Sequence, residues 1–270
     1  FDNGGGGWAC EPWFQKDMEI TADYAKKQAE STNKAVYIIG RTAGEDKDNA
    51  NWVGSYLLTD EEKENLKNIT EAFEDVCVVL NVSNIIDLKW IDEEQFKGHI
   101  KSVIIVWQGG MEGGNAVAEA LSGKATPSGK LPDTVAYDIE DYPANDNFGN
   151  ELTNLYKEDI YVGYRYFETF APEKVQFEFG FGLSYTTFDI ETVSADADDE
   201  KITLEVKVTN TGDKFSGKEV VQVYYEAPQG ALGQPARQLC AYEKTENLAP
   251  GQSQTLKSAF DINGTASYDD

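Results

Sequence analysis

The stretch AVYIIGRTAGEDKDN, residues 35–49, decides how the first half of the chain folds. Its first five residues are apolar or aromatic, which is the composition of a buried strand. From Gly40 onward the sequence turns glycine-rich and charged, so the strand should end in a loop. Inside that loop stands a single glutamate, Glu45, between Gly44 and Asp46. A carboxylate in a glycine-rich loop after a buried strand needs a chemical explanation.

Strand and helix patterns alternate through the first half of the chain. Apolar runs separated by helices indicate a mainly parallel sheet covered on both faces, a three-layer α/β sandwich. In such sheets ligands bind at the carboxyl ends of the strands, where residues 40–49 would lie. The expected strands are residues 35–39, 76–82 and 102–107, and the expected helices are 17–31, 58–75 and 109–123.

The clearest helix signal begins at Thr59. Thr59 and Glu62 have the spacing of a capping box, in which each side chain bonds the other residue's backbone N–H. Leu66, Ile69 and Phe73 then recur at helical spacing, so they should form a buried stripe.

After residue 190 the pattern becomes all-β. The acidic stretch ETVSADADDEK, residues 191–201, is interpreted as a linker. Period-two runs with turns between them then indicate an immunoglobulin- or fibronectin type III-like sandwich, with strands at 202–208, 218–226, 237–245 and 253–260. We expect two domains, 1–190 and 191–270. We expect both ends of the chain to lie inside a longer protein. The first domain would then lack its N-terminal part, and the second domain would lack its last strands.

Composition argues against several classes of function. The net charge is −25, so phosphate backbones and anionic membranes are poor partners and a neutral substrate fits better. No apolar run of about eighteen residues occurs, so no membrane-spanning helix is expected. Three scattered cysteines and one histidine do not suit a zinc or iron–sulfur site. Such cysteines imply no disulfide framework, which favours a reducing, cytoplasmic compartment.

The residues alone leave two interpretations of Glu45. It can act as a general acid or base, because the neighbouring carboxylates of Asp46 and Asp48 would favour its protonated form. The other interpretation, which spacing alone favours, is a solvated loop residue. Trp8 and Trp13, near the four glycines of the N-terminal segment, are the tryptophans best placed to face a ligand.

A second glycine-rich stretch, residues 109–114, precedes an expected helix. It could cradle a phosphate, but it lacks the Gly-Lys-Ser/Thr of a P-loop. Close packing of the helix on the sheet is the favoured interpretation.

Four segments in order resemble motifs of glycoside hydrolase family 3. The loop GRTAGEDKDN resembles Gly-Arg-x-x-Gly-Glu-x-x-Asp-Arg, with Asn49 in place of the last Arg. The other three are SVIIVWQGGMEGGNAVAEALSGKATPSGKLPDTV, LYKEDIYVGYRYFETF and FEFGFGLSYTTF, and residues 191–270 resemble that family's fibronectin type III-like domain.

The resemblance implies a retaining, exo-acting β-glycosidase, most simply a β-glucosidase that takes an oligosaccharide or β-glucoside and needs no metal or organic cofactor. It assigns the acid/base role to Glu45, with Arg41, Asp46 and Asp48 shaping the loop or touching the leaving-group sugar. The nucleophilic Asp would lie in a (β/α)8 barrel that this chain lacks, so the chain alone should be inactive. The domain order resembles the rearranged subgroup, in which these domains precede the barrel.

Two other functions stay open. One is a non-catalytic carbohydrate-binding or scaffold protein, which a parent without a barrel would indicate. The other is a nucleotide-binding α/β domain, which a calorimetric test with nucleotides would decide.

Overall fold

The computed structural model describes residues 12–42, 48–150 and 152–266. They belong to two compact units, which divide the chain between Val117 and Ala118. In the described part no helix is long and apolar enough to cross a membrane.

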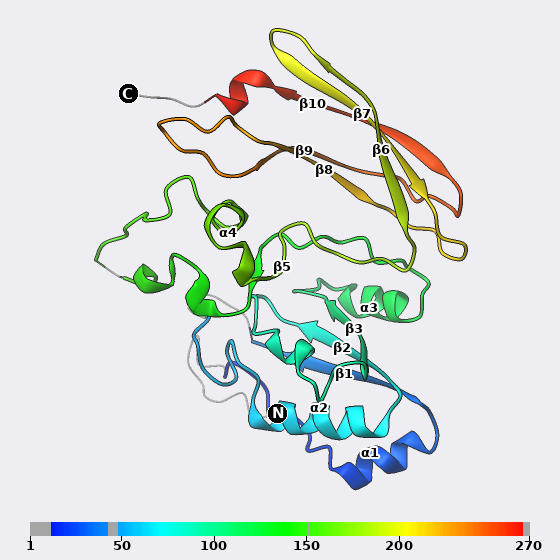
Figure 1. Cartoon of the computed structure of the whole chain (residues 1–270). Coiled ribbons are helices and arrows are strands. Elements are labelled where there is room, and N and C mark those ends of the chain that lie inside the picture. The colour runs from blue at the N-terminus through cyan, green and yellow to red at the C-terminus, as the bar shows by residue number, and fades with distance from the viewer. Residues whose placement is uncertain (1–11, 43–47, 151, 267–270) are drawn as a thin grey trace. The chain divides into compact units, whose positions relative to one another are not determined.

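The first unit is built on a parallel sheet in which the strands lie side by side in chain order. Figure 1 shows two helices on the same side of this sheet. The strands are β1 (Lys34–Gly40), β2 (Asp75–Asn81) and β3 (Ile100–Ile105), and the helices are α1 (Ala22–Ala29) and α2 (Asp60–Ala72). A short 3₁₀ helix, η1 (Lys89–Asp92), precedes β3, and α3 (Gly113–Leu121) follows it. The parallel α/β class is confirmed.

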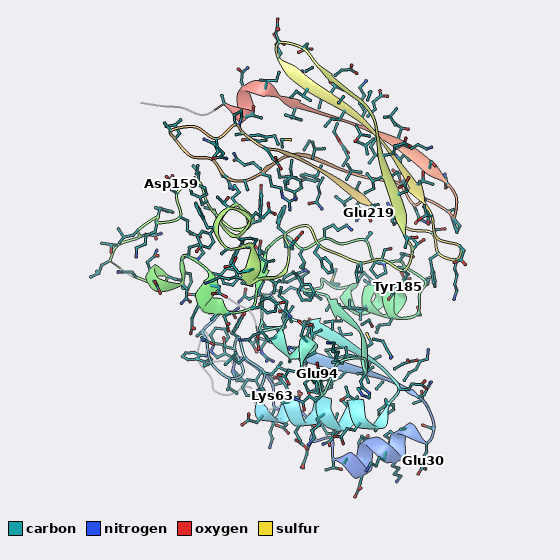
Figure 2. All side chains as sticks on the ribbon, viewed as in Figure 1. Glu30, Lys63, Glu94, Asp159, Tyr185 and Glu219 are labelled. Carbon is teal, nitrogen blue, oxygen red and sulfur yellow. The ribbon has the colours of Figure 1, made fainter. Side chains whose placement is uncertain are left out.

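The core of this unit lies between the sheet and α2. Successive strand residues point to opposite faces, so Tyr37 and Ile39 of β1 are buried while Val36 and Ile38 remain 50% and 55% exposed. The predicted stripe of α2 is confirmed, because Leu66, Ile69 and Phe73 are all buried. The opposite face of α2 carries exposed charged residues such as Lys63, labelled in Figure 2.

The predicted capping box at the start of α2 is also present. Thr59 Oγ1 accepts a hydrogen bond from the Glu62 N–H at 3.0 Å, and the Glu62 carboxylate accepts one from the Thr59 N–H at 2.8 Å. Both side chains lie in the interior, so the cap bonds satisfy buried donors that would otherwise lack partners.

The predicted helix 17–31 is wrong at its N-terminal end, because α1 begins only at Ala22, after the N-cap Thr21. The preceding segment is instead bound by Asn65 of α2, which accepts from Ile20 N–H at 2.7 Å and donates to Met18 O at 3.0 Å. These bonds use backbone groups that a helix over residues 17–20 would need for itself.

A buried phenol also holds this segment. The Tyr37 hydroxyl donates to the Asp17 carboxylate at 2.5 Å, and Asn65 donates to the same hydroxyl at 3.4 Å. Burial raises the pKa of the Tyr37 phenol above its ordinary value, and the bond to Asp17 raises it further.

The second unit begins within α3, and the segment that follows this helix carries little regular structure. Its two short strands pair antiparallel, and Ala136, Phe167 and Ala171 form a small buried cluster there. The elements are β4 (Val135–Ala136), η2 (Ile139–Asp141), η3 (Asn145–Asn147), α4 (Tyr164–Phe170), η4 (Pro172–Lys174) and β5 (Val175–Phe177).

The rest of the second unit is an antiparallel β-sandwich. One sheet has the order β10-β7-β6 and the other pairs β8 with β9. Its core brings together Val206, Val208, Val221 and Leu256 from the two sheets with Leu248, which lies between the last two strands. The strands are β6 (Phe188–Ala197), β7 (Lys201–Asn210), β8 (Val220–Tyr225), β9 (Gln238–Lys244) and β10 (Ser253–Asp261), followed by η5 (Ile262–Thr265).

The acidic linker predicted at residues 191–201 is wrong. Most of it forms β6, which pairs with β7 along its length, and Asp198 then caps the turn by accepting from the N–H groups of Glu200 and Lys201. Because β6 lies at the edge of its sheet and is mostly exposed, it tolerates acidic residues that a buried strand would not.

Helix α4 is tied to the β8–β9 sheet by a forked ion pair. Both nitrogens of the Arg237 fork donate to the Glu168 carboxylate, one of them at 2.7 Å, and the guanidinium lies 4.8 Å from the centre of the Tyr224 ring. Glu168 is therefore the residue of α4 that forms an ion pair within the described part of the chain.

Replacing Tyr37 with Phe should flatten the alkaline decline in stability. Because the folded-state pKa of Tyr37 is raised, its stabilising contribution is intact below the unfolded pKa near 10 and is lost as the pH rises above it. Between about pH 10 and 11 the wild-type free energy of unfolding should fall up to about 1.4 kcal/mol more than that of Tyr37→Phe. Urea unfolding followed by tryptophan fluorescence measures this, since every tryptophan precedes residue 118.

The matched control is Tyr24→Phe, because Tyr24 is 45% exposed on α1. This variant should keep the wild-type pH dependence. If Tyr37→Phe also kept the wild-type pH dependence of stability, the Tyr37 hydroxyl would not be a buried group with a raised pKa.

Replacing Leu248 with Ala should destabilise the β-sandwich by about 2–5 kcal/mol, because the side chain is 2% exposed within the core and its loss leaves a cavity. The exposed Leu232, at 49%, gives the control, whose replacement should change stability by less than about 0.5 kcal/mol. Urea unfolding followed by far-ultraviolet circular dichroism measures the free energy of unfolding of both variants. Similar values for both variants would contradict the assigned core.

Candidate active site

The candidate site lies at the carboxyl edge of the parallel sheet. Arg41 N–H donates to Asn81 O at 3.1 Å and Val106 N–H donates to Leu80 O at 3.0 Å, so the pairing of the strands continues to this edge. The loop with Glu45 leaves the sheet directly after Arg41. Glu45 and Asp46 lie outside the described residues, as does Trp8, so the geometry of the site is that of the two ends of the loop.

The first end of the loop is held by the side chain of Arg41, which is 5% exposed. Its guanidinium donates to three backbone carbonyls, Gly40 O at 2.9 Å, Ser55 O at 3.0 Å and Leu57 O at 3.3 Å. It also donates twice to the Glu62 carboxylate, at 2.6 and 2.9 Å. These contacts support the loop-shaping role expected of Arg41, while its contact with a sugar stays a prediction.

The Glu62 carboxylate makes two kinds of contact. Its carboxylate caps α2 through the Thr59 N–H and also receives the fork of Arg41. The capping role was predicted from local spacing. The ion pair was missed because no local pattern connects residues 41 and 62.

The second end of the loop is bound to the segment that follows β2. Asn49 Nδ2 donates to Ile85 O at 2.6 Å, and Asp87 N–H donates to Tyr56 O at 2.9 Å. The residue that replaces the family's Arg thus anchors the loop through a neutral amide. Asp48, beside it, is exposed.

The N-terminal segment lies against both ends of the loop. Thr42 N–H donates to Trp13 O at 2.7 Å, which places Trp13 beside the first end. At the second end the Phe14 ring packs on Gly54, which has φ +84° and where a Cβ would lie 2.2 Å from the ring. The structure therefore brings Trp13 to the candidate site, and its contact with a ligand stays a prediction.

Two further tryptophans differ in their positions. Trp107 follows β3 at the same edge of the sheet and has φ +51°, a conformation that is strained for a bulky residue. Trp90 instead is 2% exposed and donates to Asp87 O, so it belongs to the core. A tryptophan directly after a buried strand was the sequence signal available for Trp107.

In the glycine-rich stretch 109–114 the close packing of the helix on the sheet stays a prediction, since Gly110, Gly113 and Gly114 have open space where a Cβ would stand. A Cβ on Gly109 would lie only 2.8 Å from the Cα of Gly113, so the backbone itself fills the space near it.

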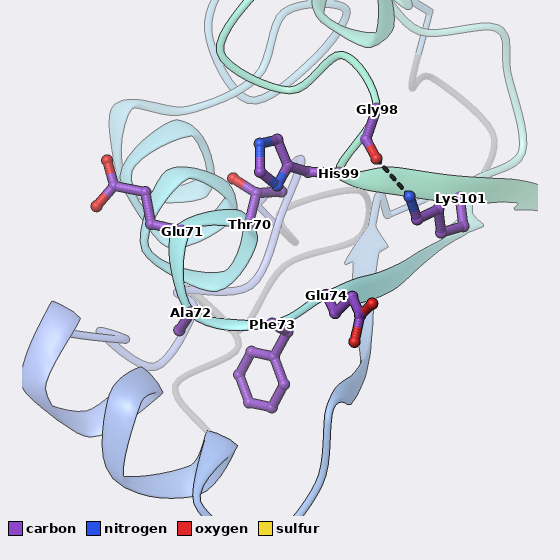
Figure 3. A pocket seen from close by; sticks show the side chains of 8 residues that line it. All are labelled: Thr70, Glu71, Ala72, Phe73, Glu74, Gly98, His99 and Lys101. Atoms are coloured by element: carbon purple, nitrogen blue, oxygen red, sulfur yellow. Dashed lines mark hydrogen bonds between the residues drawn. The ribbon is translucent and has the colours of Figure 1, made fainter.

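A shallow pocket lies at the opposite edge of the sheet, near the amino ends of β2 and β3 (Figure 3). Residues 94–99, which include His99, form turns in which Gly98 has φ +82°. Lys101 Nζ donates to Gly98 O at 2.6 Å. Ligands of parallel sheets bind at the carboxyl edge, so this pocket is separate from the candidate site. It is lined by Thr70, Glu71, Ala72, Phe73, Glu74, Gly98, His99 and Lys101.

Family models match most of the chain. The model of the glycosyl hydrolase family 3 C-terminal domain matches residues 13–185. The model of the fibronectin type III-like domain matches residues 219–270.

Similar proteins are β-glucosidases that are much longer than this chain. One from Ruminococcus albus is 50% identical over 266 residues, which are 98% of this chain and 28% of that protein. The crystal structure of a β-glucosidase from Paenibacillus barengoltzii matches with a TM-score of 0.97 at 56% identity, covering 100% of this chain and 29% of that one. β-Glucosidase 3B from Thermotoga neapolitana, solved with glucose, matches with a TM-score of 0.88 at 32% identity, covering 99% and 38%.

The matched family model, the parallel sheet with its carboxyl-edge loop and the antiparallel sandwich agree with one another. This chain belongs to glycosyl hydrolase family 3, as the family's C-terminal domain followed by a fibronectin type III-like domain.

Proposed function

We propose that this chain carries the acid/base of a retaining, exo-acting β-glycosidase, most simply a β-glucosidase that hydrolyses O-glycosidic bonds. Glu45 protonates the departing glycosidic oxygen and then deprotonates the attacking water. The substrate is an oligosaccharide or β-glucoside, and a neutral sugar suits a chain with a net charge of −25.

The observation that carries this proposal is the firm anchoring of the loop at both ends. Arg41 holds its start through five hydrogen bonds, and Asn49 holds its end through Ile85 O. A general acid must stay within hydrogen-bond reach of the oxygen that it protonates. A loop with fixed ends at the ligand-binding edge of a parallel sheet meets that requirement better than a freely mobile one.

Retention of configuration requires a second carboxylate about 5–5.5 Å from the first. We propose that a (β/α)8 barrel elsewhere in the parent protein supplies it as an Asp nucleophile. The short coverage of the β-glucosidase relatives supports a longer parent, since the chain spans 28% of the Ruminococcus albus protein.

Exposed apolar side chains within each unit support the same proposal. Val36 and Ile38 are half exposed on β1, although parallel sheets are normally covered on both faces. In the second unit Leu152, Tyr156 and Leu183 are 93%, 85% and 77% exposed. Large exposed apolar groups mark contact surfaces, and we propose that other parts of the parent chain cover them.

The remaining candidate residues take supporting roles in this proposal. Asp46 and Asp48 shape the loop or contact the leaving-group sugar. Trp8 and Trp13 offer ring faces to the same sugar, because aromatic rings present apolar area with a polar handle.

In the parent protein, Glu45→Ala should reduce turnover of β-glucosides with poor leaving groups by about 10²–10⁴-fold. Aryl β-glucosides with activated leaving groups should lose far less in the glycosylation step, because their leaving groups need little protonation. Steady-state kcat/KM across a series of leaving groups measures the difference. Azide should restore turnover of the activated substrates, since this anionic nucleophile needs no general base.

The matched control is Glu71→Ala, because Glu71 is an exposed carboxylate at the far end of α2. It should leave kcat/KM unchanged for every substrate. Equal losses by Glu45→Ala on good and poor leaving groups, without azide rescue, would overturn the acid/base assignment.

The isolated 270-residue chain should hydrolyse no aryl β-glucoside, because the nucleophile is absent. The parent protein, assayed at equal molar concentration, is the positive control. Turnover by the isolated chain that Glu45→Ala abolishes would show that the chain contains its own nucleophile.

A further inference from the structure

We infer that the buried ion pair between Arg41 and Glu62 is a positioning device for the loop that carries Glu45. Glu62 then contributes to the reaction as a positioning residue, although it belongs to a helix and touches no reacting atom in this scheme. This inference rests on the proposed function of Glu45.

The pair is almost completely removed from water. The side chains of Arg41 and Glu62 are 5% and 4% exposed, and the fork makes two bonds of 2.6 and 2.9 Å. A buried pair with this geometry has both charges satisfied, whereas loss of one partner leaves an uncompensated charge. The two side chains are therefore held in one arrangement.

The guanidinium also joins the start of the loop to residues beyond its end. Arg41 precedes the loop, while Ser55 and Leu57, whose carbonyls it binds, follow it. The guanidinium group of Arg41 thus fixes the distance between the two ends of the loop. Glu62 sets the direction of the fork, because its carboxylate is itself held by the Thr59 N–H in the capping box.

This arrangement bears on catalysis more than on stability alone. A loop that hinges at its base moves its tip by more than the shift at the base. Misplacement of a catalytic group by about 1 Å can cost about 10²-fold in rate. The rate penalty should be largest when protonation of the leaving group limits the reaction.

The charge of Glu62 can be removed while its shape is kept. In Glu62→Gln the amide oxygen can still accept from the Thr59 N–H, so the cap of α2 survives. The two charge-assisted bonds to Arg41 do not survive together, because the amide offers one acceptor in place of two. Arg41→Lys makes the complementary change, keeping the charge but losing the fork.

The experiment compares Glu62→Gln and Arg41→Lys in the parent protein with a series of aryl β-glucosides. We expect kcat for poor leaving groups to fall about 10–100-fold, KM to change less than about threefold, and activated leaving groups to be affected at least tenfold less. A merely structural role would lower the rates on all substrates alike through loss of folded enzyme. Active-site titration corrects each rate for the fraction of folded enzyme.

Two controls separate positioning from helix stability. Thr59→Ala removes the cap but leaves the ion pair, and should lower stability by about 1 kcal/mol with little change in leaving-group dependence. Glu71→Gln removes an exposed carboxylate from the same helix and should change neither the stability nor the leaving-group dependence. A leaving-group dependence in Thr59→Ala equal to that of Glu62→Gln would assign the effect to the helix and overturn the inference.

The result for Glu45→Ala distinguishes the two proposals. If that variant shows leaving-group-dependent loss while Glu62→Gln and Arg41→Lys do not, the acid/base function stands and the positioning inference is wrong. If Glu45→Ala itself shows no such dependence, both are overturned. Should Glu62→Gln fail to fold, Arg41→Lys alone decides between these outcomes.

Discussion

The buried ion pair between Arg41 and Glu62 is the interaction on which the candidate site depends. Ordering a loop costs conformational entropy for every residue that is fixed, and bonds at its ends offset part of that cost. Here one guanidinium satisfies its five donors with three carbonyls and one carboxylate. Since that carboxylate also caps α2, the same few atoms join the start of the helix, the end of the strand and the start of the loop.

Local signals predicted α2 and the parallel sheet. The Thr59 cap and the stripe begun by Leu66 each depend on residues within a few positions of one another. The extended backbone at residues 17–20 depends instead on Asn65, far along the chain, so helical propensity alone gave the wrong answer. The partner of Arg41 was unpredictable from one sequence for the same reason, because only the fold brings residues 41 and 62 together.

The second unit shows where composition misleads. An acidic run such as residues 191–201 normally favours solvated chain, yet here it supplies an edge strand whose exposed face accepts charge. What fixes it is the pairing with β7, a property of two segments and not of one. Likewise α4 carries both Arg165 and Glu168, and only the position of Arg237 on the neighbouring sheet decides that Glu168 forms the ion pair.

The anchors also explain how such a loop can change without losing its place. Arg41 and Asn49 bind mainly backbone carbonyls and Glu62, so none of these anchoring bonds depends on the side chains of residues 43–47. In the proposed function, substitutions between the anchors would alter contacts with the leaving group while the anchoring bonds stay intact. A change at Arg41 or Glu62 is different in kind, because it leaves a buried charge unpaired. The proposed function thereby assigns positioning to Arg41 and Glu62 at the base of the loop, and contact with the leaving group to the residues between the anchors.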